Sequence, residues 1–254
     1  MWWPFKKKEP KHQFYFTCDE WAIRKYAPIQ PAKNFLPPSM KEMDTFLVRK
    51  KHMLDSVKTI KSCPGILDFC SAGYVIPAWC DIEMIPTPDG QAVNVRYSHP
   101  KFKQGFHPPA VLQNFMNTKF GVRMSVKLDN PWSMWAAEDY SLMYLPMYYY
   151  DDKRNWEAIP GWIDHDIGAV SSPLNIMLKE PIPTYIKMGE PLLQIVPIKR
   201  EPITVYTGDH NEVASKRYAG LSYLHDMEFS GWVKRMRDKK SYTVDAHDTE
   251  LPIK

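Results

Sequence analysis

The chain has few glycines and no long apolar run. Its 254 residues contain 11 Gly against 23 Pro. No stretch approaches the ~20 apolar residues that a membrane-spanning helix needs, so we predict no membrane span. The high proline content argues against a helical bundle, because proline breaks helix interiors but is accommodated at strand edges and in loops.

Cysteine is scarce and irregularly spaced. The four cysteines are Cys18, Cys63, Cys70 and Cys80, and none forms a C-x-x-C pair. Their spacing does not match a zinc ribbon or finger, so we predict no metal and no cofactor and expect free buried thiols. Seven residues separate Cys63 from Cys70, which is two helical turns; this suits core packing and leaves a redox pair as the alternative.

Positive and negative side chains are nearly balanced. The formal net charge is +4 with 24% charged residues, which is typical of a mixed solvated surface and does not support nucleic-acid binding. Aromatic residues are abundant at 13%, and they predict a well-packed core. At the N-terminus, Trp2, Trp3 and Phe5 precede a short basic run and are candidate contact residues of a docked or flexible terminus.

Periodicity and proline placement divide the chain into three parts. Residues 1–38 are interpreted as an extended Pro-rich arm, 39–205 as a helix followed by a β core, and 206–254 as a helical C-terminal extension with a polar tail. Ser39 and Glu42 have the spacing of a capping box before apolar residues at helical spacing. This pattern predicts a helix over 39–60.

The core region has the pattern of short strands. Alternation and the turn signal Asp89-Gly90 predict a hairpin over 74–97. Other predicted elements are a short helix within 108–120 and strands at 122–128, 140–150, 156–163, 174–178 and 191–198. Many short strands at regular spacing are typical of a β-barrel or sandwich. The predicted fold class is therefore mainly β, with one N-terminal helix and a helical C-terminal extension.

The densest group of titratable residues is Asp164, His165 and Asp166. Neighbours along a strand point to opposite faces, so we expect the two aspartates on one side and His165 on the other. This arrangement suits a hard cation or a general base, and these three residues are the candidate catalytic residues. The alternative is a polar turn whose Asp side chains bond local amides.

A second concentration is aromatic and comprises Tyr148, Tyr149, Tyr150 and Trp156. Such rings stack on bases or sugars, but they also fill cores and the centres of protein contacts. We take these four residues as candidate interface residues.

Four blocks of sequence lie at 28–37, 63–82 and 130–133 and in a spaced series from Pro160 through Gly189 and Gln194 to Glu201. Together they resemble an uncharacterised, DUF6065-like domain family of tailed-phage genomes, especially marine T4-like phages, and of scattered bacteria. The chain departs from the family at 138–141, where the family has Pro-Gly before Tyr-Ser. The resemblance implies a phage origin and a β-rich fold, and no activity, because the function of the family is unknown.

The series Pro160-Gly-Trp-Ile-Asp164, then Leu174-Asn175, then Gly189 to Gln194 is similar to the core of dUTPase and dCTP-deaminase barrels, which have β-clip folds. This likeness implies that Asp164 helps to orient water at a nucleotide and that the strand of Gln194 packs the core. The chain has no Arg-Ser-Ser phosphate-binding element and no Gly-rich C-terminal arm. Hydrolysis of a nucleotide needs backbone amides, cations or a metal to offset the negative charge of the phosphates. Nucleotide hydrolysis is therefore the weaker hypothesis.

We therefore predict a non-enzymatic bacteriophage protein, a structural or assembly component of the virion that acts through protein–protein contacts as a homo- or hetero-oligomer. The expected partners are other phage or host proteins, and the expected location is the host cytoplasm during infection or the virion. The alternative is a nucleotide-binding or nucleotide-hydrolysing β-clip protein with its site at Asp164 and Asp166. A metal-dependent oxygenase on a β-barrel is the third hypothesis.

Overall fold

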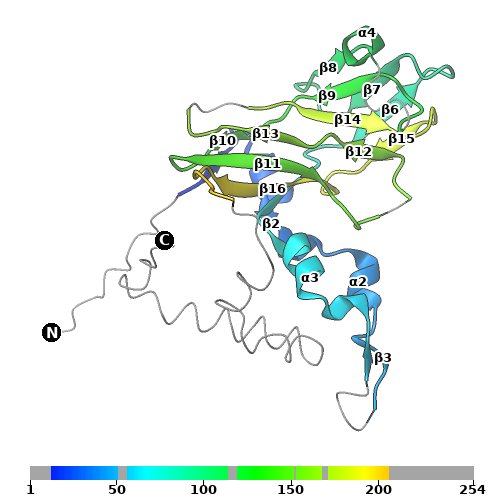
Figure 1. Ribbon diagram of the computed structural model, residues 1–254. Helices are drawn as coiled ribbons and strands as arrows, with labels where there is room; N and C mark the ends of the chain where they lie inside the picture. The colour runs from blue at the N-terminus through cyan, green and yellow to red at the C-terminus, as the bar shows by residue number, and fades with distance from the viewer. Residues whose placement is uncertain (1–12, 51–55, 114–118, 152, 168–170, 206–254) are drawn as a thin grey trace. The chain divides into compact units, whose positions relative to one another are not determined.

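The computed structural model describes residues 13–50, 56–113, 119–151, 153–167 and 171–205 (Figure 1). Within these residues the tertiary contacts define two units. The larger unit contains the described residues up to 41 and those from 70 to 201, and the smaller contains those from 42 to 69 and from 202 to 205.

The larger unit consists mainly of short strands. These are β1 (Tyr15–Thr17), β2 (Gln30–Pro31), β5 (Tyr74–Pro77), β6 (Ile82–Pro86), β7 (Val93–Tyr97), β8 (Gln104–His107), β9 (Ser125–Leu128), β10 (Ser133–Trp135), β11 (Tyr140–Pro146), β12 (Trp156–Ala158), β13 (Gly161–Ile163), β14 (Leu174–Leu178), β15 (Thr184–Ile186) and β16 (Pro191–Lys199). Its short helices are α1 (Trp21–Tyr26), the 3-10 turn η1 (Ala32–Phe35), α2 (Pro38–Glu42) and α4 (Pro109–Leu112).

These strands form antiparallel sheets. The largest has five strands in the order β13-β11-β16-β5-β2, a second has four in the order β12-β14-β9-β8, and a third has three in the order β15-β6-β7. A separate pair joins β1 to β10. The longest pairing joins β11 to β16, from Tyr140 opposite Lys199 to Pro146 opposite Leu193, and Figure 1 shows these two strands side by side.

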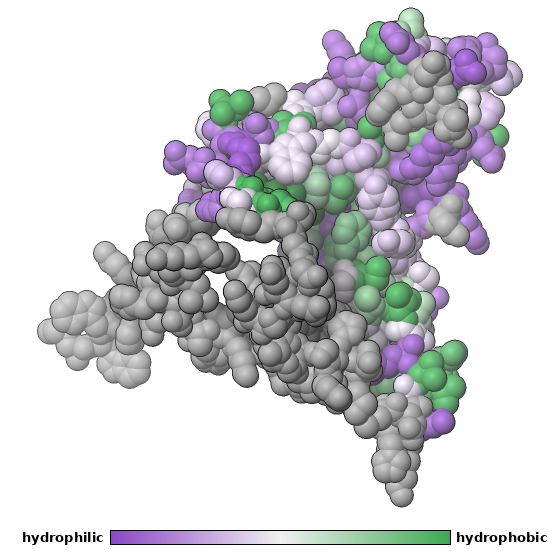
Figure 2. All heavy atoms as spheres, in the orientation of Figure 1, coloured by the Kyte–Doolittle hydropathy of each residue, from purple (hydrophilic) through white to green (hydrophobic). Residues whose placement is uncertain are grey.

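One buried apolar cluster takes side chains from all three larger sheets. Fully buried members include Leu142 of β11, Ile195 of β16, Leu128 of β9, Ile176 of β14 and Met84 of β6. The three sheets therefore share a common core. On the face seen in Figure 2, hydrophilic residues cover most of the surface around β6 to β9, and hydrophobic residues there form small separate groups.

The predicted mainly β class is confirmed, but the described strands do not close into a barrel, so that part of the prediction is wrong. The reason lies where the chain changes sheets. Residues 78–81 carry it from β5 in the five-stranded sheet to β6 in the three-stranded sheet. Residues 159 and 160 likewise separate β12 from β13, which belong to different sheets. Pairing is thereby divided among open sheets with edge strands such as β2 and β8.

The same change of sheet shortens the predicted hairpin over 74–97. Only β6 and β7 pair as a hairpin, from Ile82 opposite Tyr97 to Pro86 opposite Val93. Gly90 in the turn has φ of 67°, and a Cβ there would lie 2.5 Å from the carbonyl oxygen of Gly121. Glycine is therefore required at this position, and the local turn signal located the turn correctly.

The predicted helix over 39–60 is wrong. α2 already begins at Pro38 and ends at Glu42, so Ser39 lies inside a short helix and does not cap a long one. In the smaller unit, β3 (Phe46–Val48) pairs antiparallel with β4 (Val57–Lys58) and is followed by η3 (Ile60–Ser62). Apolar residues at helical spacing thus form a strand pair, because pairing partners outweigh local preference in short segments. α3 (Pro64–Ser71) follows η3 along the chain.

The N-terminal arm is also corrected where it is described. From residue 13 onward it contributes β1, which pairs with β10, and β2, which pairs with β5. Trp2, Trp3 and Phe5, the remainder of the arm and the predicted helical extension over 206–254 lie outside the described residues.

All four cysteines are free, and Cys18, Cys70 and Cys80 are buried as expected, while Cys63 is partly exposed. Burial raises the pKa of the Cys80 thiol to about 11, which keeps that thiol protonated and unreactive at neutral pH. Among the described helices, none is long and apolar enough to cross a membrane.

Candidate functional site

The structure gives the Asp164–Asp166 segment, here called the acid turn, the alternation that the sequence predicts. The turn directly follows β13, and both aspartates bind the side chain of Arg200, which follows β16. His165 points the other way, and only 1% of its surface is exposed. The two carboxylates therefore share one side, and the imidazole lies in the core.

Arg200 pairs with both carboxylates of the acid turn. Its Nη1 lies 2.9 Å from Oδ1 of Asp164, and its Nη2 pairs with Oδ2 of Asp166. The Ser141 hydroxyl also donates to Asp164, and the Asp139 amide donates to Asp166 at 3.0 Å. The hydrogen bond from Ser141 is the main cause that lowers the pKa of Asp164. The hydrogen bond from Arg200 is the main cause that lowers the pKa of Asp166. The network ties together neighbouring ends of β13, β11 and β16.

His165 is fully engaged inside the core. Its Nδ1 lies 3.2 Å from the Met134 carbonyl oxygen, and its Nε2 lies 2.8 Å from the Tyr144 hydroxyl. A carbonyl only accepts, so the bonding pattern places the proton on Nδ1, and Nε2 accepts from Tyr144. Burial lowers the pKa of His165, which favours this neutral form. The arrangement fits a structural histidine in the core.

A metal site at the acid turn would need further ligands beside the two aspartates. Among the described residues, no three His, Cys, Asp or Glu side chains gather closely enough to hold an ion. Asp166 Oδ1 is buried and has no hydrogen-bond partner within the described part of the chain. The contacts of both aspartates with Arg200 and the two bonds of the His165 ring nevertheless favour the structural alternative for Asp164, His165 and Asp166 over a general base or a cation site.

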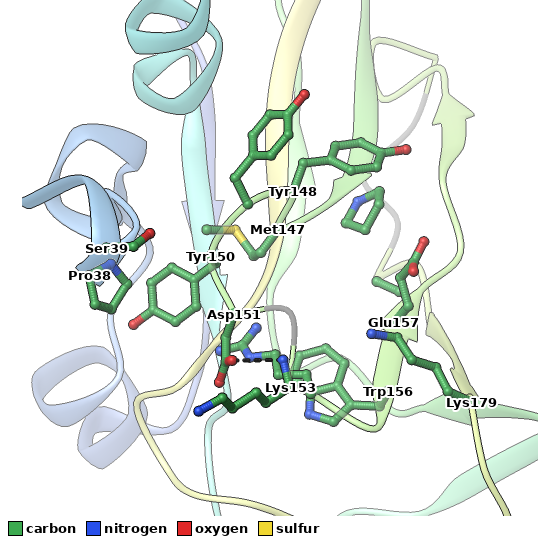
Figure 3. Close-up of a pocket in the computed structure, with 14 residues that line it drawn as sticks. Pro38, Ser39, Met147, Tyr148, Tyr150, Asp151, Lys153, Trp156, Glu157 and Lys179 are labelled. Atoms are coloured by element: carbon green, nitrogen blue, oxygen red, sulfur yellow. Dashed lines mark hydrogen bonds between the residues drawn. The ribbon is translucent and has the colours of Figure 1, made fainter. Parts of the chain in front are cut away.

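The aromatic candidates lie around an open cleft, shown in Figure 3. Pro146 ends β11, and the chain turns back through Met147–Tyr150, with the Tyr150 amide donating to the Met147 carbonyl oxygen at 3.3 Å. The cleft has a volume of about 830 Å³. We call it the tyrosine cleft and define it by the lining residues Tyr148, Tyr149, Tyr150, Lys153, Arg154 and Trp156.

The aromatic side chains differ in exposure around the tyrosine cleft. Tyr148 is 43% exposed and Tyr149 63%, and their ring centroids lie 6.4 Å apart. Trp156 on β12 is buried and belongs to the core cluster. Tyr149 has φ of 63°, a left-handed conformation that a bulky side chain rarely adopts. The rings of Tyr148 and Tyr149 are thus exposed at the cleft, whereas the Trp156 side chain is buried.

Charged side chains complete the walls. Figure 3 shows Tyr150 on the side of Pro38 and Ser39, with Glu157 and Lys179 on the opposite side. Glu157 is paired with Lys119. Asp151 Oδ1 accepts the Lys153 amide at 2.9 Å, as the dashed line shows.

Arg154 lines the tyrosine cleft, and its guanidinium lies over two aromatic rings. Its guanidinium carbon is 4.5 Å from the centroid of Tyr150 and 4.6 Å from that of Trp156. Its Nη1 donates to the Pro191 carbonyl oxygen at 2.9 Å. Burial lowers the pKa of the guanidinium, although an arginine remains charged at neutral pH.

The structure thus brings Tyr148, Tyr149, Tyr150 and Trp156 together, as the sequence suggested. The cations Lys153 and Arg154 are not among the candidate residues predicted from the sequence. The available signal was a basic pair, Lys153-Arg154, placed between Tyr150 and Trp156.

No protein-family model matches this chain, and no curated protein matches it either. The phage-family and β-clip resemblances therefore stay predictions.

Proposed function

We propose that this chain is a non-enzymatic bacteriophage protein, a structural or assembly component of the virion that binds other proteins through the tyrosine cleft. The phage context rests on the sequence blocks within residues 28–202 that resemble the phage family. The proposed architecture is a sandwich-type fold, because open sheets share one core.

The observation that carries the proposal is the conformation of Tyr149. A left-handed backbone costs a non-glycine residue roughly 1–2 kcal/mol, and the ring is 63% exposed, so burial does not offset that cost. Strained residues persist mainly at ligand clamps and other functional positions. Exposed tyrosines are also enriched at protein contacts. Together these features support a contact surface at the cleft rim.

The acid turn supports this proposal over nucleotide hydrolysis. Asp164 accepts hydrogen bonds from Ser141 and Arg200, and Arg200 also binds Asp166. A carboxylate that orients water at a phosphate needs a cation beside the phosphate, whereas Arg200 here is engaged by the two aspartates. We therefore expect no rise in melting temperature when nucleotides and divalent metals are added to the purified chain.

The test is incorporation into particles. Mass spectrometry of purified virions should detect the chain, and light scattering after size exclusion should show an oligomer or a complex with another virion protein. Tyr149→Ser should weaken that association. Tyr26→Ser is the matched control, because Tyr26 on α1 is 60% exposed and does not line the cleft. A chain that is monomeric and absent from virions would contradict the proposal.

A further inference from the structure

Arg154 is a cation in contact with two aromatic rings. Tyr150 and Trp156 contact its guanidinium at 4.5 and 4.6 Å. Such stacking leaves the edge of the guanidinium, where its N–H donors lie, as the part that can bind a ligand. The rings therefore preorganise Arg154 for an acceptor that approaches in the plane.

Within the described part of the chain, most N–H donors of the Arg154 side chain have no hydrogen-bond partner. Among the described residues, its side chain makes one hydrogen bond, to the Pro191 carbonyl oxygen, and no ion pair. Glu190 and Asp151 are close enough to raise its pKa, yet neither pairs with it. Arg154 also borders a second cleft of about 420 Å³. A guanidinium has five N–H donors, so it retains capacity for a bidentate acceptor.

The surroundings of Arg154 favour an anion. Lys153 and Lys179 line the same cleft, and within the described residues neither side chain forms an ion pair. Of the two carboxylates in the walls, Glu157 is already paired with Lys119. Asp151 remains as a local negative charge. It repels a polyanion more strongly than it repels a ligand with a single carboxylate.

We propose that Arg154 receives a carboxylate from an acidic peptide segment of a partner protein, which lies in the tyrosine cleft against Tyr148 and Tyr149. The inference rests on the proposed function and names the chemistry of the partner. A peptide fits better than single-stranded nucleic acid, because a phosphate chain would bring successive charges past Asp151 and Glu157. Neutral and apolar groups of a peptide can instead pack on the two exposed rings.

The experiment measures fluorescence anisotropy with the full chain. The probes are a fluorescein-labelled peptide of Leu and Gln that carries one central Glu (the acidic peptide), its Gln–Leu analogue in which Gln replaces that Glu, and a fluorescein-labelled oligo-dT. The acidic peptide should bind, and the Gln–Leu analogue should bind about tenfold more weakly, because hydrogen bonds to charged groups are stronger than neutral ones.

Arg154→Met should weaken binding of the acidic peptide about tenfold or more. Arg154→Lys should recover only part of it, because an ammonium lacks the planar fork. Lys153→Met is a second test, since Lys153 is exposed and its loss leaves packing intact; we expect a two- to threefold weakening, on the order of a surface ion pair. Lys103→Met, an exposed lysine outside the cleft, is the charge-matched control and should bind like the wild type.

Three results would overturn the inference: no binding of the acidic peptide, binding that Arg154→Met and Lys153→Met leave unchanged, or Arg154-dependent binding of oligo-dT in place of the peptide. The last result would assign the cleft to nucleic acid. Virion incorporation separates the two proposals. If the chain is present in virions but does not bind the peptide, only this inference is contradicted. If the chain binds the peptide but is absent from virions, only the proposed function is contradicted.

Discussion

The acid turn and the tyrosine cleft belong to the same unit and differ in how their polar groups are satisfied. At the acid turn, Arg200 binds two carboxylates and His165 uses both ring nitrogens inside the core. At the cleft, Arg154 has one hydrogen-bond partner among the described residues, and Tyr149 is strained and exposed. The denser cluster of titratable residues is thus the structural one.

This difference shows which features distinguish a binding surface from a scaffold. Buried polar groups are normally hydrogen-bonded, because an unpaired one is costly. Donors that stay open next to exposed rings do not contribute to folding in the same way. Substitutions at the acid turn should therefore lower stability, and substitutions at the cleft should lower binding.

The largest expected effect separates the two regions by stability. His165→Ala should lower the free energy of unfolding by about 2–4 kcal/mol, because it opens a cavity and removes the hydrogen bonds to Tyr144 and Met134. Urea unfolding measures this change. Tyr148→Ala, at a side chain that is 43% exposed, should change it by less than about 1 kcal/mol. Equal losses for the two variants would remove the distinction between the regions.

Arg200→Met should lower the melting temperature at neutral pH by several degrees, because it leaves the Asp164 and Asp166 carboxylates close together without a cation. In the wild type, both carboxyl pKa values lie below their unfolded values, so their contribution is present above about pH 4 and is lost as pH falls further. The variant should lose less stability in that acidic range.

Lys199→Met is the neighbouring control for Arg200→Met. Its ion pair with Glu201 is exposed and should contribute little. If both variants melt alike in thermal denaturation, the acid turn does not have the stabilising role assigned to it.

A smaller effect concerns pH between 7.5 and 5.5. Burial lowers the pKa of His165 in the folded chain, so below its unfolded value of about 6.5 the unfolded state binds more protons and stability falls. The melting temperature of His165→Phe should therefore vary less with pH over this range than that of the wild type. A slope unchanged in His165→Phe would contradict the assignment.

The smallest expected change in stability is at Tyr149. Tyr149→Gly relieves the left-handed backbone but adds freedom to the unfolded chain, so the free energy of unfolding should stay the same or rise by up to about 1 kcal/mol. Binding of the acidic peptide should nevertheless fall. Tyr149→Ala also removes the ring but keeps the strain, so it should be the less stable of the two in urea unfolding. The reverse order would show that the backbone at Tyr149 is not strained.

Local signals predicted the elements that depend on neighbours in sequence. The run Leu174–Leu178 is β14 as predicted, because its apolar and β-branched residues suit a buried strand. Asp89-Gly90 located the β6–β7 turn. Strand alternation predicted that Asp164 and Asp166 share a side, and proximity in sequence brought Tyr148, Tyr149 and Tyr150 together.

The sequence by itself determined the mainly β class, the turn at Gly90, and the acidic and aromatic members of the two candidate sites. Only the tertiary structure decided that Phe46–Val48 is a strand, that the sheets stay open and that Arg200 occupies the acid turn. It also decided which side chains join the aromatic loop at the cleft, since Pro38 and Lys179 come from distant segments. The physical reason is that strand pairing and ion pairing join residues far apart in the chain, whereas alternation and turn chemistry act between neighbours.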